Sequence, residues 1–271
     1  MYNKAYVEII NTCNLNCSFC PKTKRAFSML SVKEYEHILD KVLPITKYVY
    51  LHVVGEPTAH PNLKEIIALS VKKGAKITIT TNGTRLDYLY DCVKDNPIYK
   101  VNVSLTMTGG NELDVSTYAK KVGDYVKKFA DLKILSVMRL WNKNGDCQKN
   151  EEVLLALKEK LGQFVFNESG SVKIADYIYI EGDEQFSWRD TERERGYCMG
   201  LKDQFGILSN GTVIPCCMDN DGEIPLGNVF EEELTDILNS KRALNLRKGL
   251  MERKLVEDRC KICGFIKKFD K

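Results

Sequence analysis

The sequence predicts an α/β domain in which strands and helices alternate, followed by a small cysteine-rich module. Two observations support this prediction. Strand-type and helix-type hydrophobic runs alternate through the first two thirds of the 271 residues. The alternation stops at a charged run over residues 188–195, and the turn-rich region beyond it holds five of the ten cysteines. We therefore expect one domain over residues 1–190 and a second over 191–271.

The first domain is expected to contain six strands joined by helices through short loops, the pattern of a parallel sheet with helical crossovers. The predicted strands cover residues 5–10, 47–54, 75–80, 100–106, 132–140 and 172–180. The predicted helices cover 31–43, 62–73, 86–94, 115–130 and 150–161. Ser31 and Glu34 form a capping box at the first helix. Periodicity leaves open whether the sheet is flat or curls into a barrel, and in both cases the functional face lies at the carboxyl ends of the strands.

The second domain is expected to consist of a hairpin and a helix. Asn210-Gly211 lies between two short apolar runs, 204–208 and 212–214, and this dipeptide is a strong hairpin signal. An amphipathic helix is predicted over about 231–248. So few residues bury little core, so the module needs a metal or disulfide to stabilise it.

The composition of the chain limits which binding partners and which cellular compartment are expected. The net charge of +3 comes from 40 basic and 37 acidic residues without a basic stripe, so nucleic acid is not an expected partner. The chain shows no signal peptide at its start and no apolar run that could span a membrane, so we expect a cytoplasmic protein without a membrane partner. In that compartment thiols stay reduced, and the cysteines are better explained as metal ligands than as disulfides.

Cys13, Cys17 and Cys20 form the motif C-x3-C-x2-C directly after the first predicted strand. Three thiolates leave one position of a metal cluster unfilled, whereas a structural zinc or an electron-transfer cluster normally takes four. Gly55-Glu56-Pro57 follows the second strand and Thr81-Asn82-Gly83 follows the third. The carboxyl ends of parallel strands share one edge, so these three segments are expected to converge there.

A second set of cysteines, Cys198, Cys216, Cys260 and Cys263, lies in the C-terminal module. Four thiolates make a closed site, which spacing alone divides evenly between zinc and an iron–sulfur cluster, and the first motif favours iron–sulfur. Adjacent residues of an extended strand point in opposite directions, so we expect Cys216 rather than Cys217 to be a ligand. Cys217 is then either a hydrogen-atom donor or a buried thiol.

The first motif, with Phe19 before its last cysteine, resembles the signature of the radical S-adenosylmethionine (radical SAM) superfamily. Gly55-Glu56-Pro57 resembles that family's Gly-Gly-Glu-Pro motif, with Val54 in place of the first glycine. The four C-terminal cysteines, with residues 211–216 and 226–229, resemble the SPASM/twitch auxiliary-cluster module in its short, single-cluster form.

The resemblance implies a partial (β/α)6, TIM-like barrel and three cofactors: a [4Fe-4S] cluster held by the first three cysteines, S-adenosylmethionine on its fourth iron, and an auxiliary [4Fe-4S] cluster. It also implies cofactor contacts. Glu56 and nearby backbone are placed for the methionine ammonium, Ser104 for a ribose hydroxyl and Arg139 for a carboxylate. A core hydroxyl and a surface salt bridge are equally good explanations of the last two. The other implied cofactor-binding positions are Phe19, Gly55, Pro57 and Asn82.

The resemblance also implies a reaction. Reductive cleavage of S-adenosylmethionine gives a 5′-deoxyadenosyl radical, which takes a hydrogen from a small molecule or peptide while the auxiliary cluster accepts an electron. An external one-electron donor of the flavodoxin or ferredoxin type is implied as partner. The protein is then a dehydrogenase or peptide maturase, an oxidoreductase; an epimerase using Cys217 is the alternative, and a non-catalytic electron carrier or zinc-stapled binding protein is less favoured. The barrel begins almost at residue 5, which mildly favours a small molecule or a peptide delivered by a separate protein.

Overall fold

The computed structural model of the chain describes residues 2–108 and 114–269, which form two compact units. One unit holds residues up to 12, 21–55 and those from 186 onward, and the other holds 13–20 and 56–185. Each unit is described separately below. Among the described residues, a search for a helix of the length and apolarity needed to cross a membrane found no candidate.

The first unit contains both ends of the chain, and its sheet has the order β10-β9-β8-β1-β2. Its strands are β1 (Lys4–Val7), β2 (Tyr48–Tyr50), β8 (Gln204–Ile207), β9 (Thr212–Ile214) and β10 (Gly227–Asn228). Its helices are α1 (Val32–Val42), α6 (Leu234–Leu238), α7 (Lys241–Met251) and α8 (Asp258–Lys261), with a 3₁₀ segment at Gly264–Phe269. β1 pairs in parallel with both β2 and β8, so the N-terminal strand lies beside a strand about two hundred positions further along the chain.

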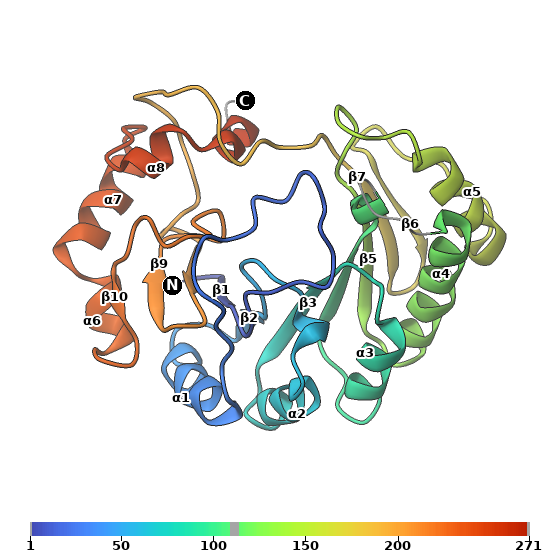
Figure 1. The fold of residues 1–271 in the computed structure, drawn as a ribbon, viewed down its shortest axis with the longest axis horizontal. Coiled ribbons are helices and arrows are strands. Elements are labelled where there is room, and N and C mark those ends of the chain that lie inside the picture. The colour runs from blue at the N-terminus through green and yellow to red at the C-terminus, as the bar shows by residue number, and fades with distance from the viewer. Residues whose placement is uncertain (1, 109–113, 270–271) are drawn as a thin grey trace. The chain divides into compact units, whose positions relative to one another are not determined.

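The second unit has the strand order β3-β4-β5-β7-β6. Its strands are β3 (Lys76–Thr81), β4 (Lys100–Ser104), β5 (Leu135–Leu140), β6 (Ser171–Ala175) and β7 (Ile178–Gly182). Helices α2 (Leu63–Lys72), α3 (Leu86–Val93), α4 (Val115–Asp131) and α5 (Asn150–Leu161) alternate with them, and 3₁₀ turns cover Pro57–Ala59 and Leu105–Thr108. β3, β4, β5 and β7 run parallel, so the predicted parallel pairing with helical crossovers is confirmed in this unit (Figure 1).

The start of α1 shows how local sequence fixes an element. The Ser31 side chain accepts from the backbone N–H of Glu34, and the Glu34 carboxylate accepts from the Ser31 N–H at 2.8 Å. This is the predicted capping box, in which two otherwise unpaired donors at the helix start are satisfied. The helix then buries one face, formed by Tyr35, Ile38, Leu39 and Val42. The predicted Asn210-Gly211 hairpin is also confirmed, because β8 and β9 pair antiparallel.

The strand predicted over 47–54 is much shorter in the structure, where β2 covers only Tyr48–Tyr50, and β1 ends at Val7, three residues before the predicted strand 5–10 does. Two further predicted elements are each divided in two. Residues 172–180 form two strands rather than one, because Tyr177 takes a left-handed φ of 63° and reverses the chain between β6 and β7. The predicted helix over 231–248 is divided into α6 and α7. α6 ends at Leu238 with Asn239 as its C-cap, and Ser240 then caps α7 by accepting from the N–H of Ala243.

Candidate metal centres

The three N-terminal cysteines lie together on the loop 13–20 of the second unit. Cys17 is buried, Cys20 is half-buried and Cys13 is exposed. The Cys13 Sγ accepts from the Leu15 amide at 3.4 Å and from the Asn82 Nδ2 at 3.6 Å. Burial raises the pKa of Cys13, while the Leu15 amide lowers it. Both donors stabilise the thiolate form, which is the form that binds iron.

Asn82 is held in position by a ring of polar side chains. Its Nδ2 donates to Asn14 Oδ1 at 2.9 Å, and Asn14 Nδ2 donates to Thr84 Oγ1 at 2.9 Å. The Thr84 hydroxyl closes the ring by donating to Asn82 Oδ1 at 2.7 Å. The turn after β3 is thereby tied to the cysteine loop through the residue that follows Cys13, as the convergence predicted from strand ends requires.

Glu56 is 2% exposed and organises the same edge of the sheet. Its Oε1 accepts from the Thr58 N–H at 3.0 Å, the Thr58 hydroxyl at 2.7 Å and the Thr81 hydroxyl at 2.8 Å. Its Oε2 accepts from the Asn82 N–H at 2.7 Å. Burial raises the pKa of Glu56, and the Asn82 amide is the strongest influence that lowers it. The carboxylate therefore connects the turn at residue 57 to the end of β3, in addition to any contact with a cofactor.

Tyr118 belongs to this site although the sequence did not single it out. From α4, its hydroxyl donates to the Asn82 carbonyl at 2.9 Å. A Cβ placed on Gly83, which has a φ of +75°, would lie 2.7 Å from that hydroxyl, so the glycine of the Thr-Asn-Gly turn is required for this approach. In the sequence Tyr118 has the spacing of an ordinary core residue of its helix, and no local pattern marks it as a contact of this turn.

Ser104 and Arg139 are neighbours in register at the ends of β4 and β5. The Ser104 hydroxyl shares a hydrogen bond with that of Thr106 at 2.9 Å. The Arg139 guanidinium lies over the Trp141 ring at 4.5 Å, and its Nε is 3.7 Å from Glu181 Oε2. Both side chains are half-buried, as is Phe19, while Pro57 is buried at the start of its 3₁₀ turn. Their cofactor contacts stay predictions.

The second cysteine set surrounds one cavity in the first unit. The thiols that line it belong to Cys198, Cys216, Cys260 and Cys263. Apolar side chains form most of the remaining wall, and Asp219 and Arg259 are its two charged residues. Burial raises the pKa of Cys198 to about 11 and raises that of Cys216 well above its usual range, and neighbouring thiols add to both shifts.

Cys217 lies apart from this cavity. It packs against a hydrophobic cluster formed by Tyr6, Val53, Leu208 and Ile214. Burial raises its pKa, and a hydrogen bond with Tyr6 lowers it. Cys216 and Cys217 thus face different surroundings, which is the arrangement expected of adjacent residues with opposite side-chain directions.

The donor sets fit iron–sulfur clusters. Within the described ranges 2–108 and 114–269, no three His, Cys, Asp or Glu side chains form a group that could hold a single metal ion. A [4Fe-4S] cluster makes a different demand, because each thiolate binds a separate iron atom. Four thiols around one cavity match a fully ligated cluster, and three thiols on one loop match a cluster with one iron left for another ligand.

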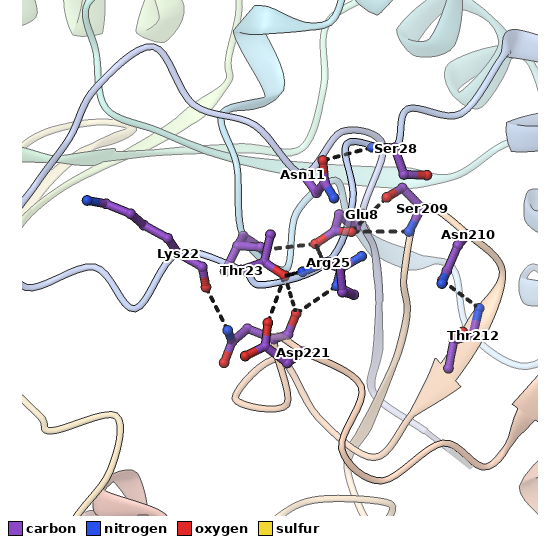
Figure 2. A network of polar contacts seen from close by, with 12 residues as sticks. Glu8, Asn11, Lys22, Thr23, Arg25, Ser28, Ser209, Asn210, Thr212 and Asp221 are labelled. Carbon is purple, nitrogen blue, oxygen red and sulfur yellow. Dashed lines mark hydrogen bonds and ion pairs between the residues drawn. The ribbon is translucent and has the colours of Figure 1, made fainter.

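A polar network around the buried Glu8 carboxylate joins the segment after Cys20 to the loop after Cys217 (Figure 2). Glu8 is fully buried directly after the end of β1, and its Oε2 accepts from Arg25 Nη2 at 2.8 Å. Its Oε1 accepts from the Ser209 hydroxyl at 2.9 Å. Arg25 Nε also donates to the Asn220 carbonyl at 3.0 Å, and Thr23 donates to Asp221. The segment after Cys20 is therefore fixed to the loop after Cys217. The sequence contains one signal of this network, the single carboxylate of Glu8 within the apolar strand predicted over 5–10.

Comparison with known proteins identifies both cysteine regions. The model of the radical SAM superfamily matches residues 7–145, which is about half of the chain, and the model of the SPASM iron–sulfur cluster-binding domain matches residues 198–264. Among curated proteins, the GTP 3′,8-cyclase of Synechocystis sp. is 34% identical over 107 residues, which are 38% of this chain and 33% of that protein. The chain spans less than two thirds of the length of the first curated relatives that it matches.

Solved structures show the same fold at low sequence identity. BtrN in complex with AdoMet and 2-DOIA has a TM-score of 0.60 at 18% identity, covering 93% of this chain and 88% of that one. SuiB of Streptococcus suis bound to the precursor peptide SuiA has a TM-score of 0.61 at 14% identity, covering 98% and 70%. These likenesses confirm the predicted fold class, an α/β fold of parallel strands with a C-terminal cluster-binding domain.

Proposed function

Because the chain belongs to the radical SAM superfamily and carries a SPASM domain, we propose that it is an enzyme in which two sets of cysteines hold two iron–sulfur clusters. Membership of the superfamily implies a [4Fe-4S] cluster that binds S-adenosylmethionine, and the SPASM domain implies an auxiliary iron–sulfur cluster. We assign Cys13, Cys17 and Cys20 to the first cluster. We assign Cys198, Cys216, Cys260 and Cys263 to the auxiliary cluster, because these four thiols line one cavity. That cavity is the observation that carries the proposal.

When bound, the first cluster and S-adenosylmethionine supply one-electron reductive cleavage to a 5′-deoxyadenosyl radical that abstracts a hydrogen atom from the substrate. This chain's residues position the cofactor. The amides of Leu15 and Asn82 donate to the Cys13 sulfur, and the Glu56 carboxylate fixes the strand ends beside it. Glu56 Oε2 is the acceptor that we assign to the methionine ammonium. Ser104 and Arg139, in register at neighbouring strand ends, are assigned to the ribose and a carboxylate.

We propose a net two-electron oxidation of the substrate. The substrate would lose a hydrogen atom to the 5′-deoxyadenosyl radical and then a proton and an electron, and the auxiliary cluster held by Cys198, Cys216, Cys260 and Cys263 would supply the acceptor for that electron. A peptide is the substrate class that we favour, since SuiB was solved with its precursor peptide. A small molecule is the second class, since BtrN was solved with 2-DOIA. An external one-electron donor of the ferredoxin or flavodoxin type completes the reaction.

Iron content and cofactor cleavage test this function. The anaerobically reconstituted protein is expected to contain about eight irons per chain, and the variant with Cys13, Cys17 and Cys20 changed to serine about four. Reduction in the presence of S-adenosylmethionine should release 5′-deoxyadenosine from the first protein and none from the variant. About four irons with one zinc in the unchanged protein would contradict the auxiliary cluster, and absence of 5′-deoxyadenosine would contradict the enzymatic function.

Neighbouring thiols provide a matched pair of variants for the auxiliary site. Cys216→Ser is expected to lower the iron content of the auxiliary site, because one iron of that cluster then loses its thiolate ligand. Cys217→Ser should keep the full iron content, because the Cys217 thiol packs against hydrophobic side chains around Tyr6 rather than lining the cavity. The measurement is iron and sulfide analysis of both reconstituted proteins. Equal loss in the two variants would contradict the assignment of Cys216 as the ligand.

The position of Cys217 supports one second candidate, an epimerase. A thiol that does not line the cavity of the four assigned ligands is available to return a hydrogen atom to a substrate radical, with no net oxidation. Turnover in deuterated water distinguishes the two functions, since an epimerase product carries deuterium at the reacting carbon. If Cys217→Ala turns over normally to the same product, the epimerase is excluded.

A further inference from the structure

Arg259 is a buried cation in the wall of the auxiliary cavity. It lies on α8 beside Cys260, and only 6% of its surface is exposed. Its Nη2 donates to the Met218 carbonyl at 2.7 Å, and its Nε lies 3.4 Å from Glu223 Oε1. Its Nη1 is buried and has no hydrogen-bond partner among residues 2–108 and 114–269.

The neighbouring carboxylates do not account for this donor. Asp219 accepts from the backbone amides of Glu223 and Ile224 at 2.8 and 2.9 Å, so its oxygens stabilise its own loop. The Glu223 carboxylate also pairs with Arg189 and is partly exposed. A guanidinium cannot lose its proton in a protein, and a buried donor without a partner is costly. The cavity therefore contains a positive charge and an unused donor on the wall that it shares with four thiols.

We propose that Arg259 donates from Nη1 to a sulfur of the auxiliary cluster and raises the reduction potential of that cluster. The inference rests on the proposed function, in which the four cysteines hold a [4Fe-4S] cluster. Such a cluster with four thiolates is anionic, and reduction makes it more so. Net charge and hydrogen bonds to the sulfurs are among the factors that set its potential. A buried guanidinium favours the reduced state and so suits a cluster that accepts an electron from the substrate.

The reduction potential of the auxiliary cluster tests this role directly. In the full chain with Cys13, Cys17 and Cys20 changed to serine, only the auxiliary cluster gives a signal in an anaerobic redox titration followed by electron paramagnetic resonance. In this background Arg259→Gln is expected to lower the equilibrium constant for reduction at least tenfold, a shift of about 59 mV to more negative potential for one electron. Lys248→Gln is the control. Lys248 belongs to the same module, but its side chain is 74% exposed and water screens its charge, so the potential should not change.

A measurement on unchanged Arg259 covers the case in which Arg259→Gln fails to bind iron. When the arginine side chains are labelled with ¹⁵N, the reduced cluster should show a hyperfine coupling to nitrogen, and Arg259→Lys should remove it. Absence of the coupling, or a fully loaded Arg259→Gln protein with unchanged potential, overturns the role of Arg259 and leaves the cluster assignment intact. Absence of iron from the background protein itself overturns the cluster assignment, and the inference with it.

Discussion

Replacing Gly55 with alanine is expected to lower the free energy of unfolding by about 2–5 kcal/mol and to reduce iron binding by the first cysteine motif. Gly55 has a φ of +80°, which costs an L-residue about 1–2 kcal/mol. A Cβ at this position would also lie 2.3 Å from the carbonyl oxygen of Ile10 and 2.9 Å from that of Thr12. These are backbone atoms that cannot rotate away, and overpacking of this kind adds about 1–3 kcal/mol. The displaced segment leads directly into Cys13.

Gly74→Ala is the matched control for this prediction. Gly74 has nearly the same φ, +82°, but a Cβ there would have no atom within 4 Å. Gly74→Ala should therefore lower the free energy of unfolding only by the conformational cost of a left-handed φ, about 1–2 kcal/mol. Urea unfolding of both cluster-loaded variants under anaerobic conditions, with iron analysis, makes the comparison. Equal destabilisation by the two substitutions would show that the contact with residues 10 and 12 has no effect.

Replacing Glu8 with alanine is expected to destabilise the fold by about 3–5 kcal/mol, because it leaves the Arg25 charge without its buried partner. The Glu8 side chain is 0% exposed and that of Arg25 only 13%, and their nearest atoms are 2.8 Å apart. The substitution also removes the acceptor of the Ser209 hydroxyl and amide. Thermal and urea unfolding measure the loss. The double variant Glu8→Leu, Arg25→Met should recover most of it, since replacing both charges by apolar groups is often neutral.

An exposed ion pair of the same length provides the control. Lys94 Nζ and Asp91 Oδ1 are also 2.8 Å apart, but their side chains are 43% and 64% exposed. Water screens that pair, so Asp91→Ala should change the unfolding midpoint far less than Glu8→Ala does. A comparable effect at both positions would mean that burial does not determine the contribution of Glu8.

Local patterns were sufficient for much of the fold. The capping box of Ser31 and Glu34 and the Asn210-Gly211 hairpin depend on residues a few positions apart, and both were predicted correctly. The turn at Tyr177 was missed because a left-handed tyrosine is rare and carries no sequence signal. The pairing of β8 with β1 was missed as well, because it joins residues about two hundred positions apart.

The sequence by itself determined the superfamily of this protein. Two cysteine motifs, Gly55-Glu56-Pro57 and the alternation of strands and helices were enough to predict the superfamily, its cofactors and its fold class, since ligand spacing and hydrophobic periodicity are local properties. Only the tertiary structure showed that the four C-terminal cysteines line one cavity and that Tyr118, Glu8 and Arg259 contact the loops around the two sites. Those contacts join residues that are distant in the chain, so no local sequence pattern marks them. A buried side chain or an unpaired donor can be identified only in the folded structure.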